Sequence, residues 1–458
     1  MKQLFSTKLR ACLASLFILS PALAPAAPFT LGNIVVVRVG DGTAALTSAA
    51  TATFLLEYTP AGVLVQTIAL PTAATGANSI LTNTGSSTSD AVLTRSANGA
   101  YLVLTGYDAA VGTATLTGTA STTNNRIIGR VAADGTVDTS TRISDAFSGT
   151  SATTANIRSA ATVDGKAFYA VGSNTGVRYV PFGNSGMAAT TAISTATPIN
   201  NRAVNIFGGN LYVSSASGTS FGVSQVGTGL PTTASQTIAM LPGFPTAPGP
   251  SSYAFYFADL STTVPGVDVL YVADDRATAE GGIQKWSLVG STWTLNGTIT
   301  GTPAPALRGL DGRTIGTAVS LVASGGGGVY LVSDNAGYNA APSTATLPAP
   351  LVATPASNAA FRGVAFAPAS TATATNASNA LPGLTISPNP ATDRITVALP
   401  QAGAATVALR DITGRLVLAP AALAADQQLR LPTGLTAGTY ILEVHQGAVT
   451  AVRRVQKN

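Results

Sequence analysis

Four arginines in the middle of the chain lie in or beside short apolar runs that could each form a strand. They are Arg158, Arg202, Arg308 and Arg362. A guanidinium group binds phosphate, sulfate or carboxylate through paired hydrogen bonds, so four that converge would form a site for an anionic ligand. The alternative is that each arginine bonds to a backbone carbonyl or to an aspartate of a neighbouring segment. We favour this structural role, because buried arginines need such partners.

Asp274, Asp275 and Asp334 are weak candidates for metal ligands. They lie where apolar strands containing a tyrosine end, and carboxylates in such loops can bind calcium. Their spacing lacks the alternating oxygen ligands, central glycine and late glutamate of an EF-hand loop. Solvated loop carboxylates are therefore the favoured interpretation. Calcium stays open as a ligand, and no other cofactor is expected.

The rarity of other reactive side chains excludes several classes of chemistry. Cys12 is the only cysteine and His445 the only histidine, so residues 28–380 contain neither. This excludes disulfides, cysteine or histidine zinc sites, thiol catalysis and Ser-His-Asp triads from the middle of the chain. The same region has only two glutamates, Glu57 and Glu280, and no general acid and base pair can be singled out.

The composition places these residues in a protein with few charges. Charged residues make up 9% of the 458 residues and apolar residues 46%, so small polar residues must cover much of the surface. The formal net charge of +5 comes from the two ends, because the stretch between them carries 14 basic and 15 acidic residues. No cluster of lysine and arginine supports nucleic-acid binding.

Residues 1–26 are typical of a secretory signal peptide. A basic start precedes the short apolar run 11–19, and Ala24-Pro25-Ala26 allows cleavage before Ala27. No later stretch reaches about 18 uninterrupted apolar residues, so no transmembrane segment is expected. The chain is therefore predicted to be exported.

Residues 27–368 are predicted to form an all-β propeller. Short strand-like runs recur between turns, and one recurring run is an apolar strand with a tyrosine, such as Leu211-Tyr212-Val213. A strand before it and a hairpin after it complete four-stranded units that recur about every 45 to 65 residues. We favour six blades, with seven as the alternative because residues 306–358 are irregular. The run Phe361–Pro368 has no tyrosine strand after it and is predicted to complete the first blade, which closes the ring.

A small-residue linker, 369–382, separates the propeller from a second domain at 383–458. Alternating apolar residues and turn signals in this domain predict a β-sandwich of about seven short strands. Its motifs follow a distinctive order. They are Pro388-Asn389-Pro390, then Asp411-Ile-Thr-Gly414-Arg415, then Gly438-Thr-Tyr440, and a basic end at Arg453, Arg454 and Lys457.

This order of motifs resembles the type A C-terminal sorting domain of the type IX secretion system. The resemblance implies a Bacteroidetes-type source, the type IX secretion machinery as partner, and export through the periplasm to a secreted or outer cell-surface location. It also implies that the sorting signal includes Pro388, Asn389, Pro390, Asp411, Gly414, Gly438, Tyr440, Arg453, Arg454 and Lys457. The propeller resembles bacterial secreted β-propellers only in general terms.

The sequence leaves the molecular activity open. The leading hypothesis is a non-catalytic secreted or cell-surface propeller that binds an unknown extracellular ligand or protein through its channel face or loops. The alternative is a secreted calcium-dependent hydrolase of the phosphoesterase type, which would need several aspartates and arginines in one concave site at the channel mouth. A third hypothesis is a structural, adhesin-like surface protein. Trp286 and Trp293 flank a hairpin, where packing is favoured over a platform for sugars.

Overall fold

A computed structural model describes residues 26–150, 152–195, 197–355, 357–369, 381, 383–411, 416–447 and 449–458. The chain divides into two compact units, Met1–Ser370 and Thr371–Asn458. Apart from Ala26, the predicted signal peptide lies outside the described residues, as do most residues of the predicted linker. Among the described residues, no helix has the length and apolar character needed to cross a membrane.

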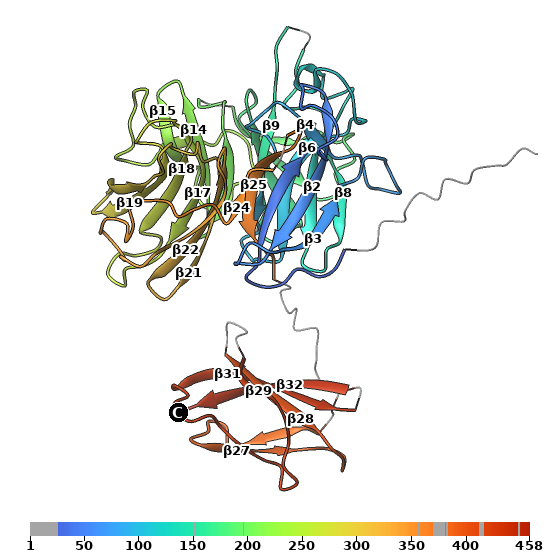
Figure 1. Ribbon diagram of the computed structural model, residues 1–458, viewed down its shortest axis with the longest axis vertical. Coiled ribbons are helices and arrows are strands. Elements are labelled where there is room, and N and C mark those ends of the chain that lie inside the picture. Colours follow the sequence, from blue (N-terminus) through green and yellow to red (C-terminus); the bar gives the residue numbers. More distant parts are fainter. Residues whose placement is uncertain are drawn as a thin grey trace, which may run out of the picture. The chain divides into compact units, whose positions relative to one another are not determined.

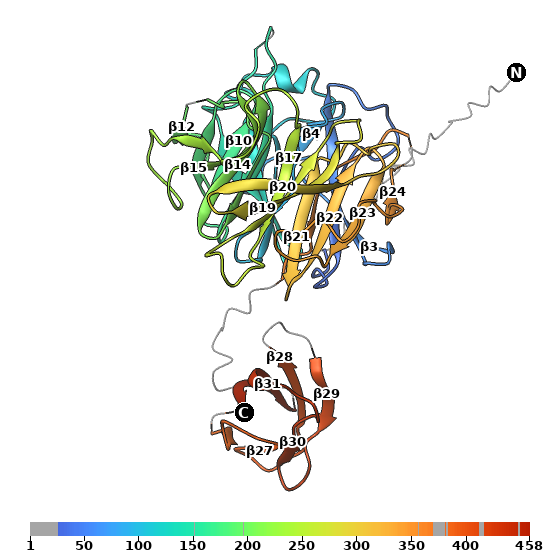
Figure 2. The same ribbon diagram turned by 90° about the vertical axis from the view of Figure 1, so that its left-hand side faces the viewer.

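The described residues of the first unit form six groups of four antiparallel strands, which we call blades 1 to 6 (Figures 1 and 2). From the innermost strand outward, blade 1 contains β25 (Ala360–Phe366), β1 (Ile34–Val39), β2 (Ala50–Tyr58) and β3 (Leu64–Ala69). Blade 2 contains β5 (Thr94–Arg95), β6 (Tyr101–Tyr107), β7 (Arg126–Ala132) and β8 (Val137–Ile143). Blade 3 contains β9 (Ile157–Ala161), β10 (Ala167–Gly172), β11 (Val177–Pro181) and β12 (Thr191–Ser194).

The other three blades follow the same plan. Blade 4 contains β13 (Ala203–Phe207), β14 (Asn210–Ser217), β15 (Ser220–Val226) and β16 (Ile238–Met240). Blade 5 contains β17 (Ser252–Ala258), β18 (Val269–Asp274), β19 (Gly282–Val289) and β20 (Thr292–Ile299). Blade 6 contains β21 (Gly309–Ile315), β22 (Ala318–Gly325), β23 (Gly328–Asp334) and β24 (Val352–Ala353), which lie side by side in Figure 2. A short strand β4 (Thr82–Thr84) joins blades 1 and 2, and a 3-10 turn η1 (Leu116–Gly118) lies in blade 2.

The innermost strands close the ring. Each contacts the innermost strands of its two neighbours, in the order β25, β5, β9, β13, β17, β21 and back to β25. The late strand β25 pairs with β1, and in Figure 1 it lies, coloured orange, among the blue strands of the chain's start. The predicted all-β propeller with six blades is therefore confirmed, including its closure by the run at 361–366.

Alternation along each strand builds the core between blades, because successive side chains point to opposite faces of a sheet. In β18, Val269, Tyr271 and Ala273 pack toward blade 6, while Leu270 and Val272 pack toward blade 4. All five side chains are buried. The central strands of a blade are therefore apolar on both faces, which explains the continuous apolar tyrosine strands in the sequence.

The two tryptophans belong to this core. Trp286 stacks on Phe244 with ring centres 4.2 Å apart, and Trp293 meets Phe257 edge to face at 5.5 Å. Both are only 5% exposed. They therefore pack within and between blades, as the sequence favoured, and leave little surface for a sugar.

The second unit, in the residues that the structure describes, is a small β-sandwich of two sheets. One sheet contains β26 (Thr385–Ser387), β27 (Arg394–Ala398) and β30 (Gln428–Arg430). The other contains β29 (Leu416–Ala422), β28 (Thr406–Asp411), β31 (Gly438–Gln446) and β32 (Val449–Lys457). Ile395 and Val397 from the first sheet share one apolar core with Leu409 and Leu442 from the second. The predicted seven-stranded sandwich is confirmed.

Candidate functional site

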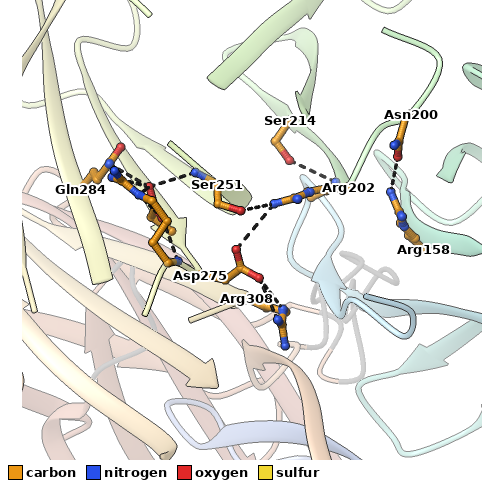
Figure 3. A network of polar contacts seen from close by, with 11 residues as sticks. Arg158, Asn200, Arg202, Ser214, Ser251, Asp275, Gln284 and Arg308 are labelled. Atoms are coloured by element: carbon orange, nitrogen blue, oxygen red, sulfur yellow. Dashed lines mark hydrogen bonds and ion pairs between the residues drawn. The ribbon is translucent and has the colours of Figure 1, made fainter. Parts of the chain in front are cut away.

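The four predicted arginines lie at or just before the start of innermost strands. Arg158 is in β9, Arg202 precedes β13, Arg308 precedes β21 and Arg362 is in β25, so they come from blades 3, 4, 6 and 1. Two further residues lie beside them: Asp90, four residues before β5 of blade 2, and Tyr253, the second residue of β17 in blade 5. We call these six residues, together with Asp275, the arginine mouth. Figure 3 shows three of its arginines with their hydrogen-bond partners.

Asp275 links two of these arginines. It accepts hydrogen bonds from Arg308, with Nε 2.9 Å and Nη2 2.8 Å from its Oδ2, and its Oδ1 lies 3.7 Å from Nη1 of Arg202 (Figure 3). Arg202 also donates to Ser251 Oγ at 2.7 Å. The guanidinium carbons of Arg202 and Arg308 lie 4.2 and 5.3 Å from the ring centre of Tyr253. The aromatic ring therefore helps to hold both cations in place.

Asp90 is the acid beside the other two arginines. Backbone hydrogen bonds from Val92 to Arg158 and from Gly363 to Ala91 fix its segment between blades 3 and 1. Its carboxylate is buried, and Oδ1 lies 3.9 Å from Nε of Arg362. Neither of its oxygens has a hydrogen-bond partner among the described residues. Burial raises the pKa of Asp90 to about 6, although the nearby charge of Arg362 lowers it.

Arg158 and Arg362 also bond to other protein groups. Arg158 Nη1 donates to Asn200 Oδ1 at 2.6 Å and to the carbonyl of Asn201 at 3.1 Å. Arg362 Nη2 donates to the carbonyl of Gly85 at 2.9 Å. The Nε atoms of both arginines are buried without an acceptor among the described residues. Burial accordingly lowers the pKa of both guanidinium groups.

A pocket of about 220 Å³ opens at the arginine mouth, among residues of blades 1, 5 and 6 and the segment 88–92 that precedes β5 of blade 2. Its lining includes Asp90, Tyr253, Arg308, Ser324, Phe361 and Arg362. The arginine mouth as a whole brings four guanidinium groups together with two carboxylates. An anion that enters the pocket would meet an excess of positive charge and free N–H groups on Arg308.

The three aspartates proposed for calcium are held by donors from the protein itself. Asp274 accepts from Arg276, Gln284 and the amide of Ser251, and its side chain is fully buried. The carboxylate of Asp275 is shared by the two arginines described above.

Asp334 accepts from Lys285 Nζ at 2.8 Å, from the hydroxyl of Tyr271 at 2.7 Å and from two backbone amides. Among the described residues, no group of three or more acids, histidines or cysteines is placed to hold a metal ion. The favoured interpretation of solvated loop carboxylates is thus wrong for Asp274 and Asp334, because the packing of the blades buries both among these donors.

Asp90 and Tyr253 were not singled out in the sequence. The repeat could have identified Tyr253, which lies near the start of β17 as Arg158 does in β9, but it gives no signal for Asp90, which lies four residues before β5. Lys285, which lies deep between blades 5 and 6, had no comparable signal. Its partner Asp334 is 49 residues away and becomes its neighbour only when the blades pack.

In the sandwich, the predicted sorting residues lie mainly around the last strand. Asn389, between Pro388 and Pro390, donates from Nδ2 to the carbonyl of Arg454 at 2.9 Å and accepts the amide of Gln456 at 2.7 Å, which clamps its turn to β32.

The other sorting residues that the structure describes lie on paired strands of one sheet. Asp411 ends β28 opposite Tyr440, and Gly438 begins β31 opposite Lys457. Tyr440 is buried, and its hydroxyl donates to the carbonyl of Thr436 at 2.8 Å. Arg453 and Arg454 lie in β32. Gly414 lies outside the described residues.

The second unit matches a known protein family. Residues 385–458 match the family described as the secretion system C-terminal sorting domain. The second unit is a C-terminal sorting domain. The resemblance inferred from the motif order is thereby confirmed. The protein is a substrate of the type IX secretion system and is exported to the cell surface or beyond it.

Comparisons with other proteins add distant likenesses in fold. PorZ, an essential surface component of the type-IX secretion system of Porphyromonas gingivalis, is 13% identical, with 89% of this chain and 64% of PorZ covered and a TM-score of 0.33. The extracellular domain of a B. thetaiotaomicron protein is 10% identical, with 92% of this chain and 57% of that chain covered and a TM-score of 0.37. AztD from Citrobacter koseri is 10% identical, with 93% and 96% covered and a TM-score of 0.28. The chain thus spans less than two thirds of the first two, and no curated protein matches it.

Proposed function

We propose that the propeller, once exported, is a non-catalytic binding module that holds an anionic group of its ligand at the arginine mouth. The observation that carries this proposal is the charge count at the mouth, where four guanidinium groups meet two carboxylates. The whole stretch of chain between the basic ends, with the mouth included, is by contrast nearly balanced in charge. An added anion would offset this local excess.

The contacts at the mouth support binding rather than acid–base catalysis. Asp275 is held by two guanidinium groups and so is a poor general base, because its lone pairs are engaged. Asp90 lines the pocket, but its carboxylate oxygens are buried beside Arg362, so they are poorly placed to take a proton from a substrate. Tyr253 is fixed under two cations. These side chains are arranged to hold charge in place.

The pocket limits the size of the bound group. Its volume of about 220 Å³ lies below the roughly 300 to 1,000 Å³ of pockets for drug-sized ligands, which favours a small anionic group. The anionic group is thus a carboxylate, sulfate or phosphate, either free or at the end of a larger ligand. Arg308 is the arginine best placed to meet it, because its side chain is 30% exposed while that of Arg362 is 5% exposed.

Calorimetric titration of the exported protein with sulfate, phosphate and glucuronate tests this proposal. We expect at least one anion to bind, with a loss of about tenfold or more in the Arg308→Gln variant. Arg430→Gln, which removes the same charge from an exposed site in the sorting domain, is the matched control and should bind like the wild type. The proposal fails if none of the three anions binds, or if both variants lose affinity equally. Binding of glucuronate, with no binding of sulfate or phosphate, would identify the anionic group as a carboxylate.

A further inference from the structure

Glu57 is a buried carboxylate without a basic partner in the part of the chain that the structure describes. It lies in β2 of blade 1 and is 1% exposed. Three N–H groups hold it, from the backbone of Thr30 at 2.8 Å, from Asn33 Nδ2 at 2.7 Å and from Gln66 Nε2 at 2.7 Å. No lysine or arginine of the described chain lies within 4.0 Å of its oxygens. A buried negative charge of this kind is expensive unless a cation is near.

Gln66 connects this carboxylate to Ala27. The same amide that donates to Glu57 also donates to the carbonyl of Ala27 at 2.9 Å and accepts from the nitrogen of Ala27 at 3.1 Å. Ala27 is the first residue of the described chain whose backbone makes a hydrogen bond. It is also the residue that the sequence predicts to be first after signal-peptide cleavage.

We propose that Glu57 and Gln66 form a binding site for the amino terminus that signal-peptide cleavage creates at Ala27. Hydrolysis of the Ala26–Ala27 peptide bond by a signal peptidase consumes one water, leaves a carboxylate on Ala26 and gives Ala27 an α-ammonium group. The neutral amide that now donates to Gln66 Oε1 becomes a cation at the same place. The buried carboxylate of Glu57 thereby gains the positive neighbour that the described chain does not otherwise supply.

The position of this site makes it relevant to ring closure. Glu57 and Gln66 belong to blade 1, the blade built from both ends of the propeller. The segment after Ala27 crosses to blade 2, where the amide of Phe29 donates to the carbonyl of Ala133 at 2.8 Å and the Phe29 ring joins the core. An ammonium group fixed at Ala27 therefore ties the start of the mature chain to both blades.

Two forms of the otherwise mature chain test the proposal, one beginning at Ala27 and one at Ala26. Each is released from a cleavable fusion that leaves no extra residue. Both forms carry an α-ammonium group. In the longer form this group lies one residue earlier, on Ala26, and the nitrogen of Ala27 is part of a neutral peptide bond. We expect the form that begins at Ala27 to melt about 2 °C higher than the form that begins at Ala26. Tryptophan fluorescence measures the melting, and it reports on blade 5 alone because both tryptophans lie there.

Glu57→Gln should abolish the difference between the two forms, because the charge that attracts the ammonium group is gone. Glu280→Gln removes the other glutamate of the propeller, which is exposed, and should leave the difference intact. If Glu57→Gln does not fold, Gln66→Ala serves instead and should also abolish the difference. Equal melting of the two wild-type forms, or a difference that persists in the Glu57 or Gln66 variant, would overturn the proposal.

Discussion

Lys285 of β19 and Asp334 of β23 form an ion pair that is sealed from solvent between blades 5 and 6. Their side chains are fully buried, with Nζ 2.8 Å from Oδ2. Lys285 also donates to the carbonyl of Gly337, and Tyr271 donates to Asp334. Burial alone would raise the pKa of Asp334, but the hydrogen bonds from Lys285 and two backbone amides outweigh it and lower that pKa. The pair is tolerated in the core because all these polar atoms are engaged.

Removing one member of this pair should be costly. We expect Lys285→Met to lower the free energy of unfolding by about 3 to 5 kcal/mol, because it leaves Asp334 charged and buried without its cation. The double variant Lys285→Met with Asp334→Asn should recover part of this loss, since it removes both charges. Urea unfolding followed by tryptophan fluorescence measures both. A loss below about 1 kcal/mol in the single variant would mean that the pair is not buried as described.

The raised pKa of Asp90 predicts how the stability of the folded protein depends on pH. Its folded pKa of about 6 lies above the ordinary value of 3.8, so between these values the folded state binds more protons than the unfolded state. Stability from this group therefore falls as pH rises from about 4 to about 6 and stays constant above. Asp90→Asn lacks this slope, so relative to the wild type it should gain about 2 to 3 kcal/mol between pH 4 and pH 7. Urea unfolding at the two pH values measures the gain, and identical pH dependence in both proteins would contradict it.

Single residues could be predicted from the sequence where the repeat fixes their place. Arg158, Arg202, Arg308 and Arg362 occupy equivalent positions in their blades, so the ring brings them to one mouth. What each arginine bonds to could not be predicted, because the partners come from other blades and depend on how the blades pack. The sharing of Asp275 by Arg202 and Arg308 is such a case. The structural role that the sequence favoured agrees with these contacts, and the ligand role stays a prediction.

At the scale of elements, the position of β25 determines how the ring of blades closes. Its place in blade 1 follows from two sequence observations, a last strand without a following tyrosine strand and a first unit without a preceding strand. Sheet edges are costly to leave open, so joining the two gaps was the simplest closure. The short β4, which links blades 1 and 2, had no comparable signal because it has only three residues outside the four-stranded plan.

The closure strand requires a glycine where blades 1 and 2 meet. A side-chain carbon on Gly363 would lie 2.0 Å from the backbone nitrogen of Leu93 and 2.7 Å from the carbonyl oxygen of Ala91. We therefore expect Gly363→Ala to destabilise the propeller by about 3 kcal/mol or more, because backbone cannot move aside as a flexible side chain can. Gly249→Ala is the control, since its nearest atom is 3.9 Å away, and it should change stability little. Equal effects in the two variants, measured by urea unfolding, would contradict this account of closure.

At the scale of the whole molecule, the protein joins a propeller, for which we propose a binding role, to a sorting domain. Each has a core of its own, and the core of the sorting domain is drawn from residues 381–455 alone. The sequence separated the two because a run of small residues without hydrophobic period lies between two strand-rich regions. The destination of the protein could be predicted because it depends on a compact set of motifs. The identity of a ligand could not, because any binding surface of the propeller is assembled from six blades.

This division predicts that stability and export can be separated. A chain that ends at residue 369 should melt within about 1 °C of the full protein when followed by tryptophan fluorescence, because both tryptophans and the whole propeller core remain. In a Bacteroidetes host with an intact type IX system, the same chain should stay in the periplasm, while residues 370–458 fused behind a signal peptide and a reporter should carry the reporter out. The reporter fused to a signal peptide alone is the control. A truncated chain that melts several degrees lower would show that the sorting domain stabilises the propeller, and export without it would show that the propeller carries a second address.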